Sequence, residues 1–133
     1  MRAARSLVLA VALFAPLAPA SAGHPWTPPL LTIDAESLRG LAATGRPLLA
    51  VDVRPLEAYE GGRLPGARSI PLSSLTARRG EVPADALVVL YGATGVEEAR
   101  IAYRYLRSTG HASVVVLEGG FDAWQAQGYG VER

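Results

Sequence analysis

The sequence contains no cysteine among its 133 residues. Disulfide bonds, thiolate metal ligands and thiol nucleophiles are therefore excluded for this chain. It also contains only two histidines, His24 and His111, which disfavours a metal site built from several imidazole rings. We accordingly expect neither a metal nor a cofactor. The missing thiol limits the chemistry of this protein more than any residue that is present.

Lysine is absent as well, and all thirteen basic residues are arginines. A GC-rich genome is a sufficient explanation for this bias. With twelve acidic residues the formal net charge is +1, so the chain lacks the positive excess that binding to nucleic acid or to an anionic membrane requires. Half of the residues are hydrophobic and 19% are charged, which is typical of a single folded domain with a packed core.

Residues 1–22 have the pattern of a secretory signal peptide. Arg2 and Arg5 form a positive start, a short apolar run follows, and an A-x-A cleavage site ends at Ala22. The apolar run is about half as long as the ~20 residues that a membrane-spanning helix needs. We therefore expect cleavage after Ala22 and a periplasmic or secreted bacterial protein, with an uncleaved signal anchor as the alternative. A chain without thiols suits an oxidising compartment.

After a proline-rich lead-in at 23–29, in which Trp26 is a candidate anchor, strand-like and helix-like segments alternate through a single domain at 30–133. Apolar runs predict strands at 30–33, 48–53, 68–70, 87–91 and 114–117. Helical patterns occur at 34–43, 55–59, 73–79, 96–108 and 121–127. Strands separated by helices need crossover connections, so the sequence predicts an α/β fold with a parallel sheet covered on both faces.

Several local motifs make this assignment more specific. Residues 49–70 contain D-V-R at the end of a strand, then E-x-Y, then R-L-P-G-A, and residues 117–124 read L-E-G-G-F-D-A-W. These motifs, in this order around the apolar strand at 87–91, resemble the signatures of the rhodanese family over residues 30–133. The resemblance implies a small three-layer fold with a parallel sheet of about five strands and helices on both faces. It also implies a sulfurtransferase-like protein.

The same resemblance exposes a departure at the centre of the expected site. In active rhodaneses the loop after this strand begins with a cysteine, around which successive backbone N–H groups curl to stabilise a thiolate or persulfide. That thiolate attacks the sulfur donor and holds the transferred sulfur. Here Gly92 stands at the cysteine position, so no side chain is available as nucleophile. Thr94 lies two residues further on, and its hydroxyl without a general base would be a poor sulfur carrier.

We therefore expect no catalytic residue, and treat the loop as a candidate ligand pocket. Its members are Gly92, Ala93, Thr94, Gly95, Val96 and Glu97. Glu97, at a position that is often arginine in active members, and Glu98 complement the dipole of the following helix and place negative charge beside the loop. Asp52 and Arg54 are expected to support loop backbones. Arg63 replaces the histidine of the family pattern, either facing the loop or solvated at the surface.

Three functions remain open at this stage. The first is a catalytically inactive binding or accessory module with a periplasmic protein partner, in sulfur or redox metabolism. The second is a receptor that uses the vacated loop for a small molecule or anion, with the glycines allowing close approach to the backbone. The third is sulfurtransferase-related chemistry that borrows a thiol from a partner, or an unrelated reaction using Thr94, Asp52, Arg54 or Glu97.

Overall fold

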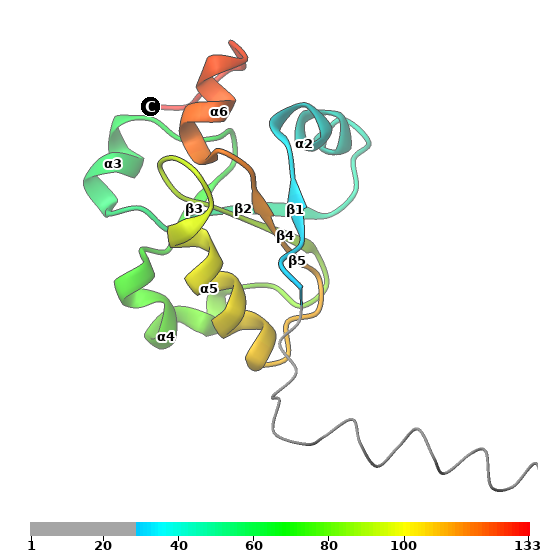
Figure 1. Cartoon of the computed structure of the whole chain (residues 1–133), viewed down its shortest axis with the longest axis vertical. Coiled ribbons are helices and arrows are strands. Elements are labelled where there is room, and N and C mark those ends of the chain that lie inside the picture. Colours follow the sequence, from blue (N-terminus) through cyan, green and yellow to red (C-terminus); the bar gives the residue numbers. More distant parts are fainter. Residues whose placement is uncertain (1–28) are drawn as a thin grey trace, which may run out of the picture.

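The computed structural model describes residues 29–133, so the predicted signal peptide and the lead-in as far as residue 28, including Trp26, lie outside it. Its strands form one sheet in the order β1-β5-β4-β2-β3, and all neighbouring strands are parallel (Figure 1). The bounds are β1 Thr32–Ile33, β2 Leu48–Asp52, β3 Arg68–Ser69, β4 Leu87–Tyr91 and β5 Val114–Leu117. The predicted five-stranded parallel sheet is therefore confirmed.

The α-helices alternate with these strands as the sequence pattern predicts. They are α2 Ala35–Ala42, α3 Leu56–Gly61, α4 Leu75–Arg78, α5 Glu97–Ser108 and α6 Gly120–Ala126. The helix predicted at 73–79 is instead a short α4 between two 3-10 turns, η2 Leu72–Ser74 and η3 Arg79–Glu81. Pro71, whose ring fixes φ, begins the first of these turns through a 2.8 Å hydrogen bond from the N–H of Ser74 to its carbonyl.

Two apolar clusters cover the two faces of the sheet, as expected for parallel strands that are buried on both sides. On one face α4 and α5 pack on β2, β4 and β5. In α5, the predicted stripe of Ala99, Ala102, Tyr103 and Leu106 is buried. On the other face, α2 and α6 contribute the side chains of Ala35, Leu38, Phe121 and Trp124. Figure 1 shows these two helix layers on opposite sides of the strands.

The two edge strands are shorter than the sequence predicts, with two residues each in β1 and β3. Their length is set by pairing with a single neighbour: Thr32 and Ile33 align with β5, and Arg68 and Ser69 align with β2. The central strands β2 and β4 share five paired positions and are the buried runs that the sequence marks most clearly. Within residues 29–133 no helix is long and apolar enough to cross a bilayer.

Candidate functional site

The candidate loop, residues 92–96, joins the carboxyl end of β4 to the first turn of α5. It lies at the edge of the sheet where parallel α/β folds usually bind ligands. Gly92 is buried, whereas Ala93, Thr94 and Gly95 are exposed. The structure therefore brings the predicted loop residues together at one end of the sheet, next to Asp52 at the end of β2, which pairs with Tyr91.

The start of α6 holds this loop in place. The backbone N–H groups of Phe121 and Asp122 donate to the carbonyls of Gly92 and Ala93, at 2.8 and 3.0 Å. This close approach requires glycine at position 120, where φ is +60° and a Cβ atom would lie 2.6 Å from the carbonyl oxygen of Gly92. Gly120 of the closing motif therefore allows α6 to hold the loop in this position.

Replacing Gly120 with alanine is expected to destabilise the protein by at least about 2 kcal/mol, because strain at a positive φ adds to overpacking against backbone atoms. Chemical unfolding measures this loss. Gly40→Ala is the matched control: it lies in α2 with nothing within 4 Å of an added Cβ, and should leave stability unchanged or slightly raised. Equal stabilities of the two variants would contradict the proposed role of Gly120.

The space beside Gly92 is occupied by the carboxylate of Glu98. Oε1 of Glu98 accepts a 3.0 Å hydrogen bond from the N–H of Ala93. A Cβ atom at Gly92 would lie 2.7 Å from this oxygen and 3.1 Å from the Cβ of Glu98. The loop thus already contains an anionic group, contributed by the chain itself, on the N–H that follows the nucleophile position. Omission of a side chain at position 92 does not leave an empty pocket.

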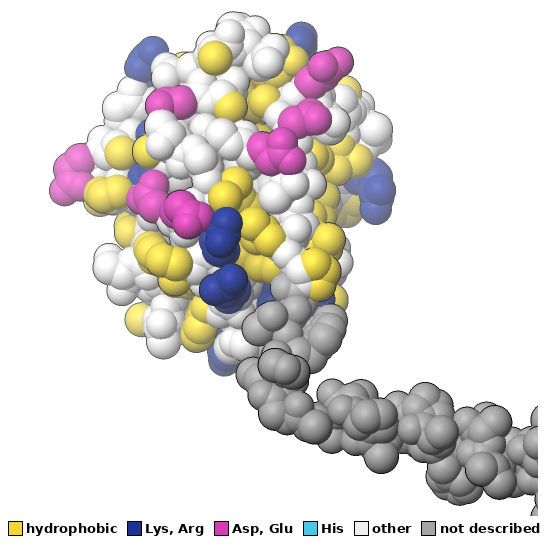
Figure 2. Space-filling view, in the orientation of Figure 1, with side chains coloured by type: hydrophobic (Ala, Val, Ile, Leu, Met, Phe, Trp, Pro, Cys, Tyr) yellow, Lys and Arg dark blue, Asp and Glu magenta, His cyan; other side chains and the backbone are white. Residues whose placement is uncertain are grey.

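Glu97, which the sequence places beside the loop, points elsewhere. Its side chain is 76% exposed, and its carboxylate lies 3.1 Å from the guanidinium of Arg100. Figure 2 shows acidic side chains over the start of α5, with arginine side chains beside them along the helix. The carboxylate that contacts the loop is therefore that of Glu98, while Glu97 contributes to the helix surface.

The other loop residues, Ala93, Thr94, Gly95 and Val96, supply a single hydroxyl group, that of Thr94. Thr94 is exposed, and Val96 caps α5 without a side-chain hydrogen bond. Gly95 has a φ of +57°. Residues 29–133 also contain no cluster of three or more acidic or histidine side chains placed to hold a metal ion.

Asp52 and Arg54 form a buried ion pair beneath the loops. Nη2 of Arg54 lies 2.6 Å from Oδ2 of Asp52, and the two side chains are 7% and 0% exposed, respectively. The same Nη2 donates to the carbonyl of Gly62 at 2.7 Å, and the guanidinium lies 4.3 Å from the ring centroid of Phe121. These contacts join the end of β2 to the loop after α3 and to α6, which supports the structural role expected for both residues.

Tyr91, the last residue of β4, is fully buried beside this pair. Its hydroxyl accepts a hydrogen bond from the N–H of Leu64 at 3.2 Å. Burial first, and then the negative charge of Asp52 and a hydrogen bond with it, raise the pKa of Tyr91 well above its usual value. The phenol is therefore protonated in the folded protein across the physiological range and holds the strand end against the loop before Pro65.

This pKa shift predicts a loss of stability in alkali. Above pH ~10 the phenol of Tyr91 ionises in the unfolded chain but keeps its proton in the folded protein. The unfolded state then binds fewer protons, so the free energy of unfolding falls with rising pH, by about 1.4 kcal/mol per pH unit for this group. Urea unfolding between pH 9 and 11 should show a flatter decline in Tyr91→Phe than in the wild type. Parallel declines would contradict the assignment.

Arg63 does not contact the candidate loop. Its guanidinium lies 4.5 Å from the ring centroid of Tyr59, and Nη1 donates to the carbonyl of that residue at 3.3 Å. Nε lies 3.8 Å from the carboxylate of Glu132, and the backbones of these two residues form an antiparallel bridge. Arg63 therefore connects the C-terminal segment to the loop after α3. Its side chain neither faces the candidate loop at 92–96 nor is freely solvated.

A hollow of about 400 Å³ opens beside the loop, at the carboxyl ends of β2 and β3. We call it the carboxyl-edge hollow. Of the lining residues in the described part of the chain, Glu98 alone is charged. Exposed apolar side chains occur on the two helices that contribute to this region, Leu56 in α3 (49% exposed) and Ile101 in α5 (58%). The remaining lining residues are Val53, Pro55, Pro71, Leu72 and Ser73.

Sequence reasoning placed the nucleophile position but did not predict that Glu98 contacts the loop or that Gly120 packs against it. The adjacent acidic residues at 97 and 98 were a signal for an acidic contact with the loop, and the G-G pair was a signal for close packing at Gly120. Both roles depend on contacts between separate segments of the chain, and the sequence pattern does not predict these contacts. The predicted support by Asp52 and Arg54 does correspond to contacts in the structure.

Comparison with known proteins identifies the fold. A family model described as a rhodanese-like domain matches residues 34–127. The chain is 42% identical over 74 residues to the uncharacterized protein YqhL of Bacillus subtilis, a match that covers 56% of this chain and only 58% of YqhL. It is 34% identical over 96 residues to a sulfurtransferase of Allochromatium vinosum, covering 72% of this chain and 89% of that protein.

Solved structures agree with these sequence matches. The Alr3790 protein of Anabaena sp. superposes with a TM-score of 0.69 at 33% identity, covering 75% of this chain and 81% of that one. A rhodanese-related protein of Thermoplasma volcanium gives a TM-score of 0.69 at 25% identity, covering 77% and 97%. The loop with Gly92 and Glu98 thus lies in a fold shared with sulfurtransferases, and the chain belongs to the rhodanese-like domain family.

Proposed function

We propose that this chain is an exported rhodanese-like domain that does not itself transfer sulfur and acts by binding a partner protein. One observation carries the proposal: at the nucleophile position there is a glycine, and the adjacent space holds the carboxylate of Glu98. Sulfur transfer through this loop needs a thiolate, and the chain has no cysteine to supply one. Export rests on the signal-peptide pattern of residues 1–22.

The position of Glu98 also favours a binding module over an anion receptor in the loop. Its carboxylate occupies the N–H of Ala93 and places a negative charge where an anion would have to sit. An anionic ligand would have to displace this side chain. The rest of the loop edge offers apolar contact area instead, because Pro55, Pro71 and Leu72 line the carboxyl-edge hollow.

We assign partner binding to this hollow and its apolar rim. Leu56 immediately follows Pro55, and Ile101 lies one helical turn after Glu98, so both exposed side chains adjoin lining residues of the hollow. A concave apolar surface with exposed aliphatic side chains nearby is typical of protein interaction sites. Glu98 gives it negative charge, which suits a partner segment that carries arginine or lysine.

Two measurements test the proposal. The purified wild-type chain should show no thiosulfate:cyanide sulfurtransferase turnover above the buffer background, and robust turnover by tag-free protein would overturn it. Affinity capture from periplasmic extract should return a specific partner that Ile101→Glu no longer retains. Leu31→Glu is the control, because Leu31 is also exposed (45%) but lies next to β1, the edge strand opposite β3. Equal loss in both variants, or no specific partner under several growth conditions, would contradict partner binding at the hollow.

A further inference from the structure

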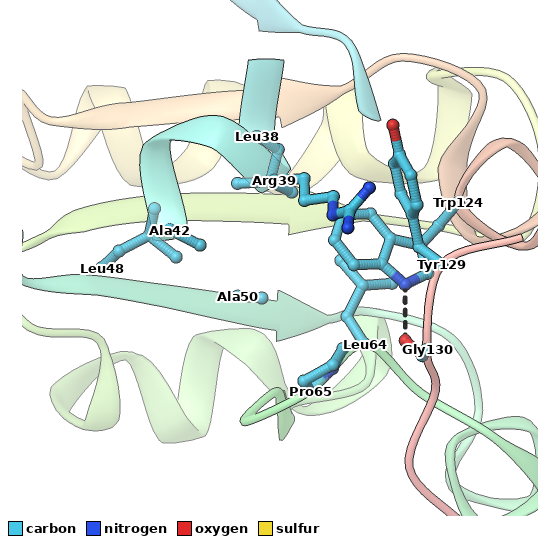
Figure 3. A pocket seen from close by; sticks show the side chains of 10 residues that line it. All are labelled: Leu38, Arg39, Ala42, Leu48, Ala50, Leu64, Pro65, Trp124, Tyr129 and Gly130. Atoms are coloured by element: carbon cyan, nitrogen blue, oxygen red, sulfur yellow. Dashed lines mark hydrogen bonds between the residues drawn. The ribbon is translucent and has the colours of Figure 1, made fainter. Parts of the chain in front are cut away.

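A second cavity lies on the other helix layer, away from the loop. It has a volume of about 280 Å³ and is bounded by α2, β2, α6 and the C-terminal segment. We call it the Arg39 cavity. It shares no lining residue with the carboxyl-edge hollow and includes none of residues 92–98. Its lining residues are Leu38, Arg39, Ala42, Leu48, Ala50, Leu64, Pro65, Trp124, Tyr129 and Gly130 (Figure 3).

The walls of the Arg39 cavity are apolar and well supported. Leu38, Leu64 and Trp124 are buried members of one core cluster. The indole N–H of Trp124 donates to the carbonyl of Gly130 at 2.9 Å, so this polar group already has its partner. The ring of Tyr129 meets the ring of Trp124 edge to face, with 5.0 Å between centroids. The side chains that form the walls therefore offer apolar contact to a ligand, and the part of the ligand that they surround does not need hydrogen-bonding groups.

One cation stands at this cavity. Among the residues of 29–133 that line it, Arg39 alone is charged, and the guanidinium carbon lies 4.5 Å from the ring centroid of Tyr129. In Figure 3 the Arg39 side chain extends from α2 towards the two aromatic rings. Within residues 29–133 no ion pair involves Arg39, and Glu36 one turn earlier makes none with it. A guanidinium that stacks on a ring keeps its edge donors free for a carboxylate.

We propose that the Arg39 cavity binds a small apolar molecule that carries one anionic group, such as a medium-chain or single-ring carboxylate. The apolar body fills the space between Leu38, Leu64 and Trp124, and the anion pairs with Arg39 beside Tyr129. At about 280 Å³ the cavity lies just below the usual size range of ligand pockets, roughly 300–1,000 Å³, so the ligand is small. This site is independent of the loop and of the partner surface proposed above.

Tryptophan fluorescence tests the proposal directly, because Trp124 lines the cavity. The chain has two tryptophans, so a Trp26→Phe background leaves Trp124 as the sole reporter. Octanoate, kept below its micelle concentration, is the probe, and 1-octanol is its uncharged match in length. We expect a saturable change with octanoate and binding of 1-octanol about tenfold weaker, the effect of losing one charge-assisted pair.

Substitutions then distinguish the contribution of the Arg39 charge to binding from that of the cavity volume. Arg39→Gln should weaken octanoate binding about tenfold and leave 1-octanol binding unchanged. Arg104→Gln is the control, since Arg104 is an exposed arginine on α5 that does not line the cavity. Ala42→Phe, at an exposed lining position, should weaken both probes by obstruction without disturbing the core. No saturable change with octanoate, equal binding of the two probes, or wild-type octanoate binding by Arg39→Gln would overturn the proposal.

Discussion

Replacing Gly92 with cysteine and Glu98 with alanine in the same chain is expected to give a thiol that reacts readily at neutral pH, whereas Gly92→Cys alone gives a much slower one. In the single variant the new side chain meets the Glu98 carboxylate, because a Cβ at position 92 lies 2.7 Å from Oε1. A carboxylate beside the new side chain raises the pKa of the thiol, because a nearby like charge disfavours the thiolate. At pH 7 the double variant should therefore alkylate about tenfold faster, or more.

The rate of iodoacetamide alkylation as a function of pH measures this difference. Gly92→Cys with Glu97→Ala is the matched control, because Glu97 is exposed and pairs with Arg100. It should behave like the single variant. The double variant with Glu98→Ala should also show the first detectable thiosulfate:cyanide turnover of this chain. If Gly92→Cys alone reacts as fast as the double variant, Glu98 does not occupy the loop in solution in the manner described.

Asp52→Ala is expected to produce the largest loss of stability among these variants. It removes the partner of Arg54 and leaves a guanidinium that is 7% exposed without its carboxylate. Breaking a buried ion pair from one side costs about 3–5 kcal/mol, because the remaining charge is neither paired nor hydrated. Domains of this kind are stable by only about 5–15 kcal/mol, so the variant would lose a large part of its stability.

Urea unfolding at pH 7 gives the free energy of unfolding for this comparison. Glu81→Ala, which breaks the exposed Arg78–Glu81 pair, is the control and should leave it almost unchanged. The double variant Asp52→Ala with Arg54→Met should recover part of the loss, since it removes the unpaired charge while keeping apolar contact with Phe121. A single variant within about 1 kcal/mol of the wild type would show that the pair is not a main support of the strand end.

The sequence by itself determined the architecture and the missing nucleophile. The runs at Leu48–Asp52 and Leu87–Tyr91 are apolar nearly throughout, which only strands buried on both faces of a sheet require. The spacing of buried residues in α5 follows the helical period and marks the side that packs on the sheet. The sequence alone shows that position 92 is a glycine and therefore has no side chain to act as nucleophile. These features are local in the chain, so a local pattern suffices to predict them.

Only the tertiary structure decided which acidic residue contacts the loop. Glu97 and Glu98 are adjacent and equally suited to the first turn of α5, but successive residues of a helix point about 100° apart. The angle at which α5 packs on the sheet directs Glu98 to Ala93, whereas Glu97 pairs with Arg100 one turn along the same helix.

The Arg39 cavity was likewise beyond prediction, because Arg39 and Tyr129 are ninety positions apart in the chain and meet only through the packing of α2 against the C-terminal segment. Edge-strand length and the fit of Gly120 against the loop also depend on partners from distant segments. Contacts of this kind depend on how whole helices and strands pack against one another. A local pattern of residues does not specify that packing.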